Sequence, residues 1–244
     1  PWCLPPLGGH FGLSMSVDSG GTQGASSSIE PAMTPYGCYV TFNALAGNLV
    51  SGDTNDAIDI FVHDRKTGET ERVSVGLTGE QSREDSSEPS MSGDGRYVAF
   101  TSRDHRLVPG DSRRRRRKDV FVYDRKTGSI ERVSVSSEGE EGDHDSGSPS
   151  MSADGRYVAF ASKARNLVPG DKNRSEDIFL HDLKTGTTER VSVSGGAPSV
   201  SADGRFVAFE SKALRALLLP RQWCHLTAAG ASGGVHRLSV SRVC

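Results

Sequence analysis

The stretch from Pro149 to Val193 decides the fold. It reads P-S-M-S-A-D-G-R-Y-V-A-F-A-S, then after three residues N-L-V-P-G-D-K-N-R-S-E-D-I-F-L-H-D, then L-K-T-G-T-T-E-R-V-S-V. Nearly the same text begins at Pro89, a looser copy begins at Pro31, and a fourth begins at Pro198, so successive starts lie 58, 60 and 49 residues apart. Self-similarity at such a period predicts an array of one supersecondary unit.

Each unit contains four short segments with strand character, separated by turns. Asp154-Gly155 lies between two such segments, and Asp-Gly between β-formers predicts a tight hairpin because glycine adopts positive φ easily. Gly186 marks a second reversal of the same kind. We therefore expect a four-stranded antiparallel meander, with strands in the third copy at Ser150–Ser152, Arg156–Ser162, Asp177–His181 and Glu189–Ser194.

The hydrophobic pattern predicts how these strands are buried. Tyr157–Phe160 is continuously apolar, which is typical of a strand covered on both faces. Arg190–Ser194 alternates with period two, as expected of a peripheral strand with one wet face. Small sheets covered on both faces and repeated in series pack face to face around an axis, so the sequence predicts an all-β fold, a β-propeller of four-stranded antiparallel blades.

The repeated text also resembles a known family. P-S-x-S-x-D-G-R-Y-V-A-F followed by D-I-F-x-x-D-x-x-T-G-x-x-x-R-V-S-V is similar to the WD40-like repeat of TolB-type propellers, over roughly residues 14–212. The resemblance implies a propeller scaffold without catalytic residues. It also implies an exported bacterial protein, periplasmic or secreted.

The repeat divides the chain into unequal parts. Residues 1–13 carry no repeat signature and are expected to form an irregular leader, and 14–244 hold the propeller repeats: a partial blade at 14–17, blades at 31–75, 89–135 and 149–193, and a degenerate blade at 198–241. Propellers have about four to eight blades. Either about four units close on themselves, or they form an incomplete ring, an open arc that exposes apolar faces at its ends.

The fourth copy loses the pattern between Ala213 and Ala229. Arg237–Ser241 then echoes Arg190–Ser194, the expected fourth strand of the preceding copy. A diverged terminal blade and a disturbed reading frame both explain this. The abrupt change of composition between matching flanks favours the second.

Composition excludes several classes of function. The 244 residues carry a formal net charge of −2, so no overall field points to nucleic acid. No apolar run approaches the about 18 residues of a membrane span, so we expect no membrane insertion. The cysteines lack C-x-x-C spacing, which argues against a metal or redox centre and favours incidental thiols over disulfides; they are Cys3, Cys38, Cys224 and Cys244.

Meander topology predicts where a binding surface lies. The first and third turns of every blade share one end, and both are tight. The second loops and the connections between blades share the other end, and all of them are long. We expect this long-loop face to bind any partner, since binding residues concentrate on loops held by a rigid scaffold.

Two loops on this face carry the pattern G-D-x-N-x-x-x-D. Oxygen ligands at alternate positions could bind a hard cation such as calcium, from Asp53, Asn55 and Asp59 in one copy and from Asp171, Asn173 and Asp177 in another. The competing interpretation is turn capping, in which these side chains bind nearby backbone N–H groups. We favour capping, because the Gly and bidentate Glu of an EF-hand are missing, and we expect no other cofactor.

A dense basic run occupies the same loop of the second copy. It consists of Arg113, Arg114, Arg115, Arg116, Arg117 and Lys118. Such a run can bind phosphate or an acidic protein partner, and without interleaved aromatic residues it offers no stacking platform for nucleic acid. The competing interpretation is a solvated loop, balanced by the acidic residues of the connection 136–148.

These observations favour a non-catalytic scaffold that binds a protein, or a glycan, through its long-loop face. The G-x-S-x-G match at Gly230–Gly234 lacks the strand and helix that a nucleophile elbow needs. The alternative is the accessory propeller of a larger hydrolase of the prolyl-oligopeptidase type. A decayed gene product is a third interpretation.

Overall fold

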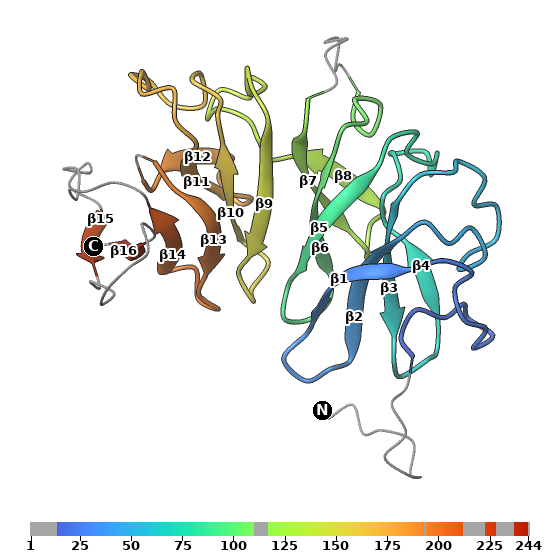
Figure 1. Ribbon diagram of the computed structural model, residues 1–244. Helices are drawn as coiled ribbons and strands as arrows, with labels where there is room; N and C mark the ends of the chain where they lie inside the picture. Colours follow the sequence, from blue (N-terminus) through green and yellow to red (C-terminus); the bar gives the residue numbers. More distant parts are fainter. Residues whose placement is uncertain (1–13, 110–116, 193, 212–222, 228–236, 244) are drawn as a thin grey trace.

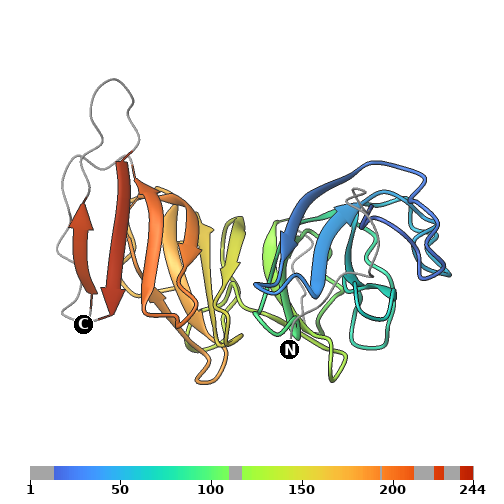
Figure 2. The ribbon, with the colours of Figure 1, turned by 90° about the horizontal axis from the view of Figure 1, so that it is seen from below.

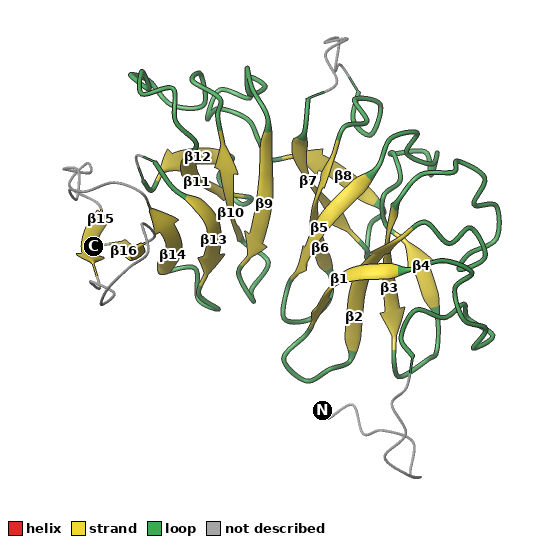
Figure 3. Ribbon diagram, in the orientation of Figure 1, coloured by secondary structure: helices red, strands yellow, loops and turns green. Residues whose placement is uncertain are grey.

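The computed structural model describes residues 14–109, 117–192, 194–211, 223–227 and 237–243, and beyond Glu210 it describes the backbone alone. All regular elements in these residues are strands (Figure 3). None of the described residues belongs to a helix that could cross a membrane.

The strands form four antiparallel sheets of four strands each. The first sheet has the order β1 (Ser28–Met33), β2 (Tyr39–Ala44), β3 (Asp59–Asp64) and β4 (Thr70–Arg72). The second has β5 (Ser86–Met91), β6 (Tyr97–Ser102), β7 (Asp119–Asp124) and β8 (Ser129–Arg132). The third has β9 (Ser146–Met151), β10 (Tyr157–Ser162), β11 (Asp177–Asp182) and β12 (Thr187–Arg190). The predicted meander is confirmed in these three sheets.

The fourth sheet departs from the meander. Its order is β13 (Gly196–Val200), β14 (Phe206–Ser211), β16 (Arg237–Val243) and β15 (Trp223–Thr227). The expectation that Arg237–Ser241 forms the fourth strand is wrong, because β16 pairs directly with β14 and so takes the third place. This copy lacks the D-I-F text of a third strand, which leaves that place beside β14 free for the last segment.

The four sheets follow one another in an arc (Figures 1 and 2). Their first strands contact one another in succession, β1 with β5, β5 with β9 and β9 with β13. The first and fourth sheets lie at opposite ends, so the described residues form an open arc. A propeller-like arrangement is thereby confirmed.

The hydrophobic core lies between sheets. Phe100 of β6 packs with Ile60 and Val62 of β3 in the preceding sheet, and corresponding clusters fill the next two junctions. The second strands of the second and third sheets are therefore covered on both faces, as the apolar run Tyr157–Phe160 predicts. Because each core is shared by two sheets, neighbouring blades stabilise each other.

A tyrosine–glycine contact repeats at the tight-turn end of each junction. The ring of Tyr97 lies against Gly155 of the next sheet, where an added Cβ would clash with it. The same relation joins Tyr39 to Gly95 and Tyr157 to Gly204. These glycines have φ between 71° and 73°, so their position needs glycine both for its backbone angle and for the close approach of the ring.

Two strand boundaries of the third sheet differ from expectation by four residues, and four others differ by one or two. The first strand of the third sheet begins at Ser146 and contains a bulge, with φ of 52° at Ser148, whereas Ser150 was expected to start it. The fourth strand ends at Arg190 although Ser194 was expected to end it. It ends early because Ser192 turns inward, and its Oγ accepts a hydrogen bond from the N–H of Ile178 at 3.2 Å.

Cys38 is disulfide-bonded, so the expectation of incidental thiols is wrong for this residue. Cys38 takes the place that Arg96 and Arg156 have in the next two copies. Those arginines tie the first turn to the third through Asp124 and Asp182. The first sheet has no arginine at this position, and a covalent bond is formed there instead.

The first sheet exposes an apolar side chain that the inner sheets bury. Met33 of β1 is 62% exposed. The corresponding Met91 is only 9% exposed, because it packs against strands of the preceding sheet. At this end the expectation that an open arc exposes apolar surface is met by Met33, while Val40 and Phe42 of the same sheet are buried.

Candidate functional site: the long-loop face and its cleft

The two ends of the sheets differ as the topology predicts. At one end the first and third turns are joined, since Arg125 Nη1 donates to the carbonyl of Gly95 at 2.5 Å and Arg65 Nη1 donates to that of Gly37 at 2.7 Å. At the other end the second loops meet the connections between sheets: Asn166 Nδ2 donates to the carbonyl of Glu141 at 2.7 Å. Hydrogen bonds thus hold each end together, and the longer loops all lie at the second end.

The expected calcium residues do come together, and an arginine lies among them. In the first sheet Arg72 Nη1 lies 2.9 Å from Asp53 Oδ1 and 3.3 Å from Asp59 Oδ2. Asn55 Nδ2 donates to Asp59 Oδ2 at 2.7 Å, and Ser74 Oγ donates to Asp59 Oδ1 at 2.5 Å. The guanidinium therefore neutralises the carboxylates that a cation would need.

The third sheet repeats this arrangement. Arg190 Nη1 lies 3.2 Å from Asp171 Oδ1 and 3.3 Å from Asp177 Oδ2, and Asn173 Nδ2 donates to both oxygens of Asp177 at 2.9 Å. The N–H of Ser175 donates to Asn173 Oδ1 at 2.8 Å, which is the turn capping that the sequence favours. Burial raises the pKa of Asp177, and of Asp59 in the first sheet.

Within the described residues no group of three or more His, Cys, Asp and Glu side chains is arranged to hold a metal ion. Calcium binding at these loops stays a prediction. The arginine of each cluster was missed, as was Ser74 of the first, although the text R-V-S in the three whole copies was the available signal.

The basic run lies mostly outside the described residues, which include Arg117 and Lys118 but not 113–116. Arg117 Nη1 donates to the carbonyl of Gly142 at 3.3 Å, and the N–H of Lys118 donates to Asp145 Oδ1 at 3.1 Å. The run therefore ends beside the connection from the second sheet to the third, on the long-loop face. The G-x-S-x-G match at 230–234 also lies outside the described residues.

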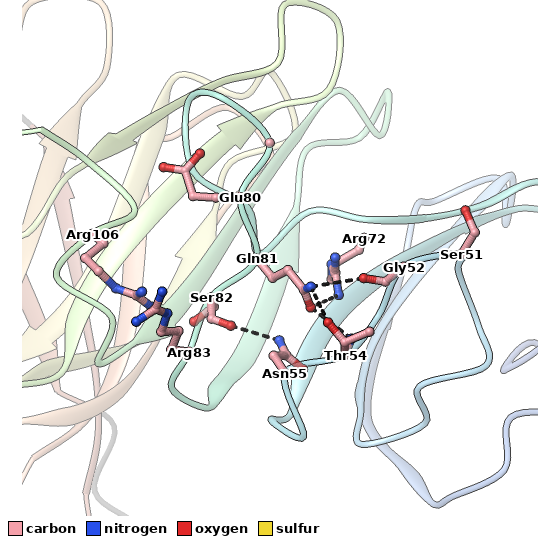
Figure 4. Close-up of a pocket in the computed structure, with 11 residues that line it drawn as sticks. Ser51, Gly52, Thr54, Asn55, Arg72, Glu80, Gln81, Ser82, Arg83 and Arg106 are labelled. Carbon is pink, nitrogen blue, oxygen red and sulfur yellow. Dashed lines mark hydrogen bonds between the residues drawn. The ribbon is translucent and has the colours of Figure 1, made fainter.

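A cleft of about 910 Å³ opens on this face between the first two sheets (Figure 4). It is lined by Ser51, Gly52, Thr54, Asn55, Arg72, Gly79, Glu80, Gln81, Ser82, Arg83 and Arg106. Gln81 holds one wall together, since its Nε2 donates to Gly52 O at 3.0 Å and to Thr54 Oγ1 at 2.9 Å. Arg72 Nη1 donates to Gln81 Oε1 at 3.2 Å, which places the buried arginine cluster behind this wall.

The opposite wall carries two arginines organised by one buried carboxylate. Asp104 accepts the N–H of Arg83 at 2.6 Å and Arg106 Nε at 2.8 Å, and it also pairs with Arg106 Nη2. Although burial opposes the effect, the hydrogen bonds from Arg106 and from the Arg83 N–H lower the pKa of Asp104. A permanent negative charge therefore lies under the wall, and sequence reasoning did not single out any of these three residues.

Comparisons with known proteins bear on the fold. No family model and no curated protein matches the chain. A protein of Agrobacterium tumefaciens assigned as TolB matches 92% of this chain and 64% of its own length, with 17% identity and a TM-score of 0.54. A puromycin-hydrolysing peptidase of Mycobacterium tuberculosis matches 78% of this chain and 26% of its own, with 14% identity and a TM-score of 0.48.

The propeller domain of the trilobed protease from Pyrococcus furiosus matches 75% of this chain and 49% of that one, with 14% identity and a TM-score of 0.46. The chain thus spans somewhat less than two thirds of the Agrobacterium protein. At these identities the similarity establishes architecture, and it agrees with the four antiparallel sheets. The protein is a β-propeller whose fold is similar to that of the Agrobacterium TolB protein.

Proposed function

We propose that this propeller is a non-catalytic scaffold that binds a protein partner through its long-loop face. The observation that carries the proposal is the difference between the two ends of the sheets. The tight-turn end is closed by the tyrosine–glycine contacts and by arginine bonds to turn carbonyls. The long-loop end carries the cleft and the last two residues of the basic run, Arg117 and Lys118, and a surface that binds must offer accessible shape and charge.

The basic run is part of this proposed surface. Arg117 and Lys118 lie on the long-loop face beside the second junction, and 113–116 precede them directly in sequence. Positive charge near a docking surface attracts an acidic partner and increases its association rate. We place the partner and the scaffold in the periplasm or outside the cell, as the resemblance to TolB-type repeats implies. The alternative of an accessory hydrolase propeller stays a prediction.

Partner capture with two charge-reversal variants tests the proposal. In one variant Arg113–Arg117 become Glu. In the control, three lysines that are exposed on the tight-turn end, Lys66, Lys126 and Lys184, become Glu. Each is used to capture proteins from an extract of the source cells, and the captured proteins are compared by mass spectrometry. We expect the loop variant to lose a partner that the wild type and the control both retain. Equal retention by all three would contradict the proposal.

A further inference from the structure

The wall of the cleft that carries Arg83 and Arg106 departs from the repeat. In the first and third copies the corresponding positions hold Ala46 and Asn48, and Ala164 and Asn166, where the second copy has Asp104 and Arg106. Because the sheets are otherwise closely alike, the chain itself shows what the architecture needs at these positions.

The asparagines have a structural task. Asn48 Oδ1 accepts the N–H of Ala25 at 2.7 Å and its Nδ2 donates to Gln23 O at 2.9 Å. Asn166 does the same with Asp143 N–H, at 2.8 Å, and with the Glu141 carbonyl. In both copies an asparagine thus fastens the segment that leads into its sheet.

The second copy fastens its connection differently. Asp104 accepts the N–H of Arg83, the amide that corresponds to those of Ala25 and Asp143, at 2.6 Å. The carboxylate therefore takes over the acceptor role of the asparagine. Arg106 pairs with that carboxylate and lines the cleft. Alanine and asparagine satisfy the same junction elsewhere, so the arginine is not required for the fold.

Positive charge is the accessible charge on this wall. Arg83 is exposed, and among the described residues its guanidinium has no hydrogen-bond or ion-pair partner. Arg106 keeps a third of its side chain exposed, while the Asp104 side chain is only 2% exposed. Glu80 also lines the cleft, but its carboxylate accepts hydrogen bonds from the hydroxyl and N–H of Thr78 in its own turn. Figure 4 shows both arginine side chains on one side of the cleft.

Two further positions that distinguish this junction from the second support the same conclusion. Gln81 is neutral where the second junction has Glu141, and Arg83 stands where that junction has Asp143. Glu141 pairs with Arg132, so the second junction satisfies its arginine with an extra carboxylate. At these two positions the first junction therefore has two fewer carboxylates and one more guanidinium than the second junction.

We propose that Arg83 and Arg106 bind a side-chain carboxylate of an acidic segment of the protein partner in this cleft. This inference rests on the proposed function and names the chemistry that the partner presents. Guanidinium groups bind carboxylates through paired, charge-assisted hydrogen bonds. Glu80 at the cleft favours a singly charged carboxylate over a phosphate, whose greater negative charge it would repel more strongly.

The chain offers a variant that tests this without a change of net charge. D104A/R106N restores the alanine and asparagine of the first and third copies, so we expect it to fold. R165N removes an exposed arginine from the long-loop face outside the cleft and serves as a control. Binding of a fluorescent ten-residue peptide rich in Glu is measured by anisotropy at low salt, beside matched peptides in which Gln or phosphoserine replaces Glu. Circular dichroism melts verify folding.

We expect the wild type and R165N to bind the Glu peptide and to discriminate against the Gln peptide. D104A/R106N should bind the Glu peptide about 10- to 100-fold more weakly, as expected when hydrogen bonds between charged groups are lost. No binding by the wild type, equal binding of the Gln peptide, or an unchanged affinity of D104A/R106N would overturn the inference. Tighter binding of the phosphoserine peptide would assign the cleft to phosphate and overturn it as well.

The outcome is separable from that of the partner-capture experiment. If D104A/R106N binds the Glu peptide normally while the Arg113–Arg117 variant loses its partner, the cleft assignment fails and the proposed function stands. If both variants retain every partner and every affinity, both fail.

Discussion

Replacing Gly155 by alanine should destabilise the propeller through two separable effects. Gly155 has φ of +71°, a backbone angle that costs an alanine about 1–2 kcal/mol. The added Cβ would also clash with Tyr97 Cδ2 and lie 3.0 Å from Cε2. The ring cannot move aside easily, because the Arg96 guanidinium lies 4.6 Å from its centre and is itself fixed by two hydrogen bonds to Asp124.

A second glycine isolates the backbone effect. Gly186 has the same φ of +71°, and an added Cβ there would meet nothing within 4 Å. We therefore expect Gly186→Ala to cost about 1–2 kcal/mol. Gly155→Ala should cost an additional amount of about 1–3 kcal/mol for overpacking. In a chain of this size each kcal/mol corresponds to a fall of about 2–4 °C in Tm.

Thermal melts followed by circular dichroism compare the wild type, the single variants Gly155→Ala, Gly186→Ala and Tyr97→Leu, and the double variant Tyr97→Leu/Gly155→Ala. A leucine in place of Tyr97 removes the ring, so the cost of alanine at 155 in that background should fall to the cost measured at 186. The difference between the two backgrounds is the coupling energy of the contact. If Gly155→Ala costs no more than Gly186→Ala in the wild-type background, the contact does not couple the blades and the reasoning is wrong.

Three further changes test other parts of the structure. Burial lowers the pKa of His181 below 6.5. The contribution of His181 to stability is therefore complete above pH 6.5 and is lost as the pH falls toward the folded-state pKa. The double variant H181Y/T188I, which copies the pair found in the second sheet, should lose less unfolding free energy than the wild type between pH 6.5 and 5. Arg190→Met should lower the free energy of unfolding by about 3–5 kcal/mol, because it leaves buried carboxylates unpaired. Adding calcium should raise the Tm of this variant but not of the wild type. A calcium-dependent rise of Tm in the wild type would contradict the role given to the guanidinium. Met33→Lys should reduce light scattering at high protein concentration, since Met33 is a largely exposed apolar side chain at the end of the arc. Unchanged scattering would contradict a role of Met33 in association.

Most of the fold follows from local signals in the repeated text. The Asp154-Gly155 turn and the apolar run after it are contiguous in sequence, and both placed their strands correctly. The end of the fourth strand was not predictable in this way. Ser192 leaves the ladder for a hydrogen bond with Ile178, a partner 14 residues earlier, and alternation cannot reveal a contact across that distance. The alternation of residues along a strand likewise could not reveal that Cys38 is disulfide-bonded.

The candidate site was predicted less completely than the fold. The acidic loops do bring their carboxylates together, as the G-D-x-N-x-x-x-D pattern suggested. The arginine among them was missed, because Arg190 follows Asp177 by 13 residues and looked like the solvent side of an alternating strand. Arg106 was missed because one arginine in a polar loop resembles any surface residue.

Comparison of equivalent positions within the chain separates two kinds of departure from the repeat. Gly93 N–H donates to Ala153 O at 2.8 Å, and Ala153 N–H donates to Ala202 O at 3.0 Å, so these turns form a ladder between sheets. The first copy has Pro35 at this position, which has no N–H to donate. This proline therefore interrupts the ladder between the first and second sheets, whereas exposed Met33 reflects the place of its sheet at the end of the arc.

The Asp104 and Arg106 pair is a departure of the other kind. It lies at an inner junction with a sheet on either side, and it keeps the connection fastened while adding a guanidinium to the cleft. No packing or pairing requirement of the sheets explains the change, because Ala164 and Asn166 meet that requirement one junction further on. A residue that the architecture does not need, held in place by a buried carboxylate at an accessible cleft, is best explained by a ligand outside the chain.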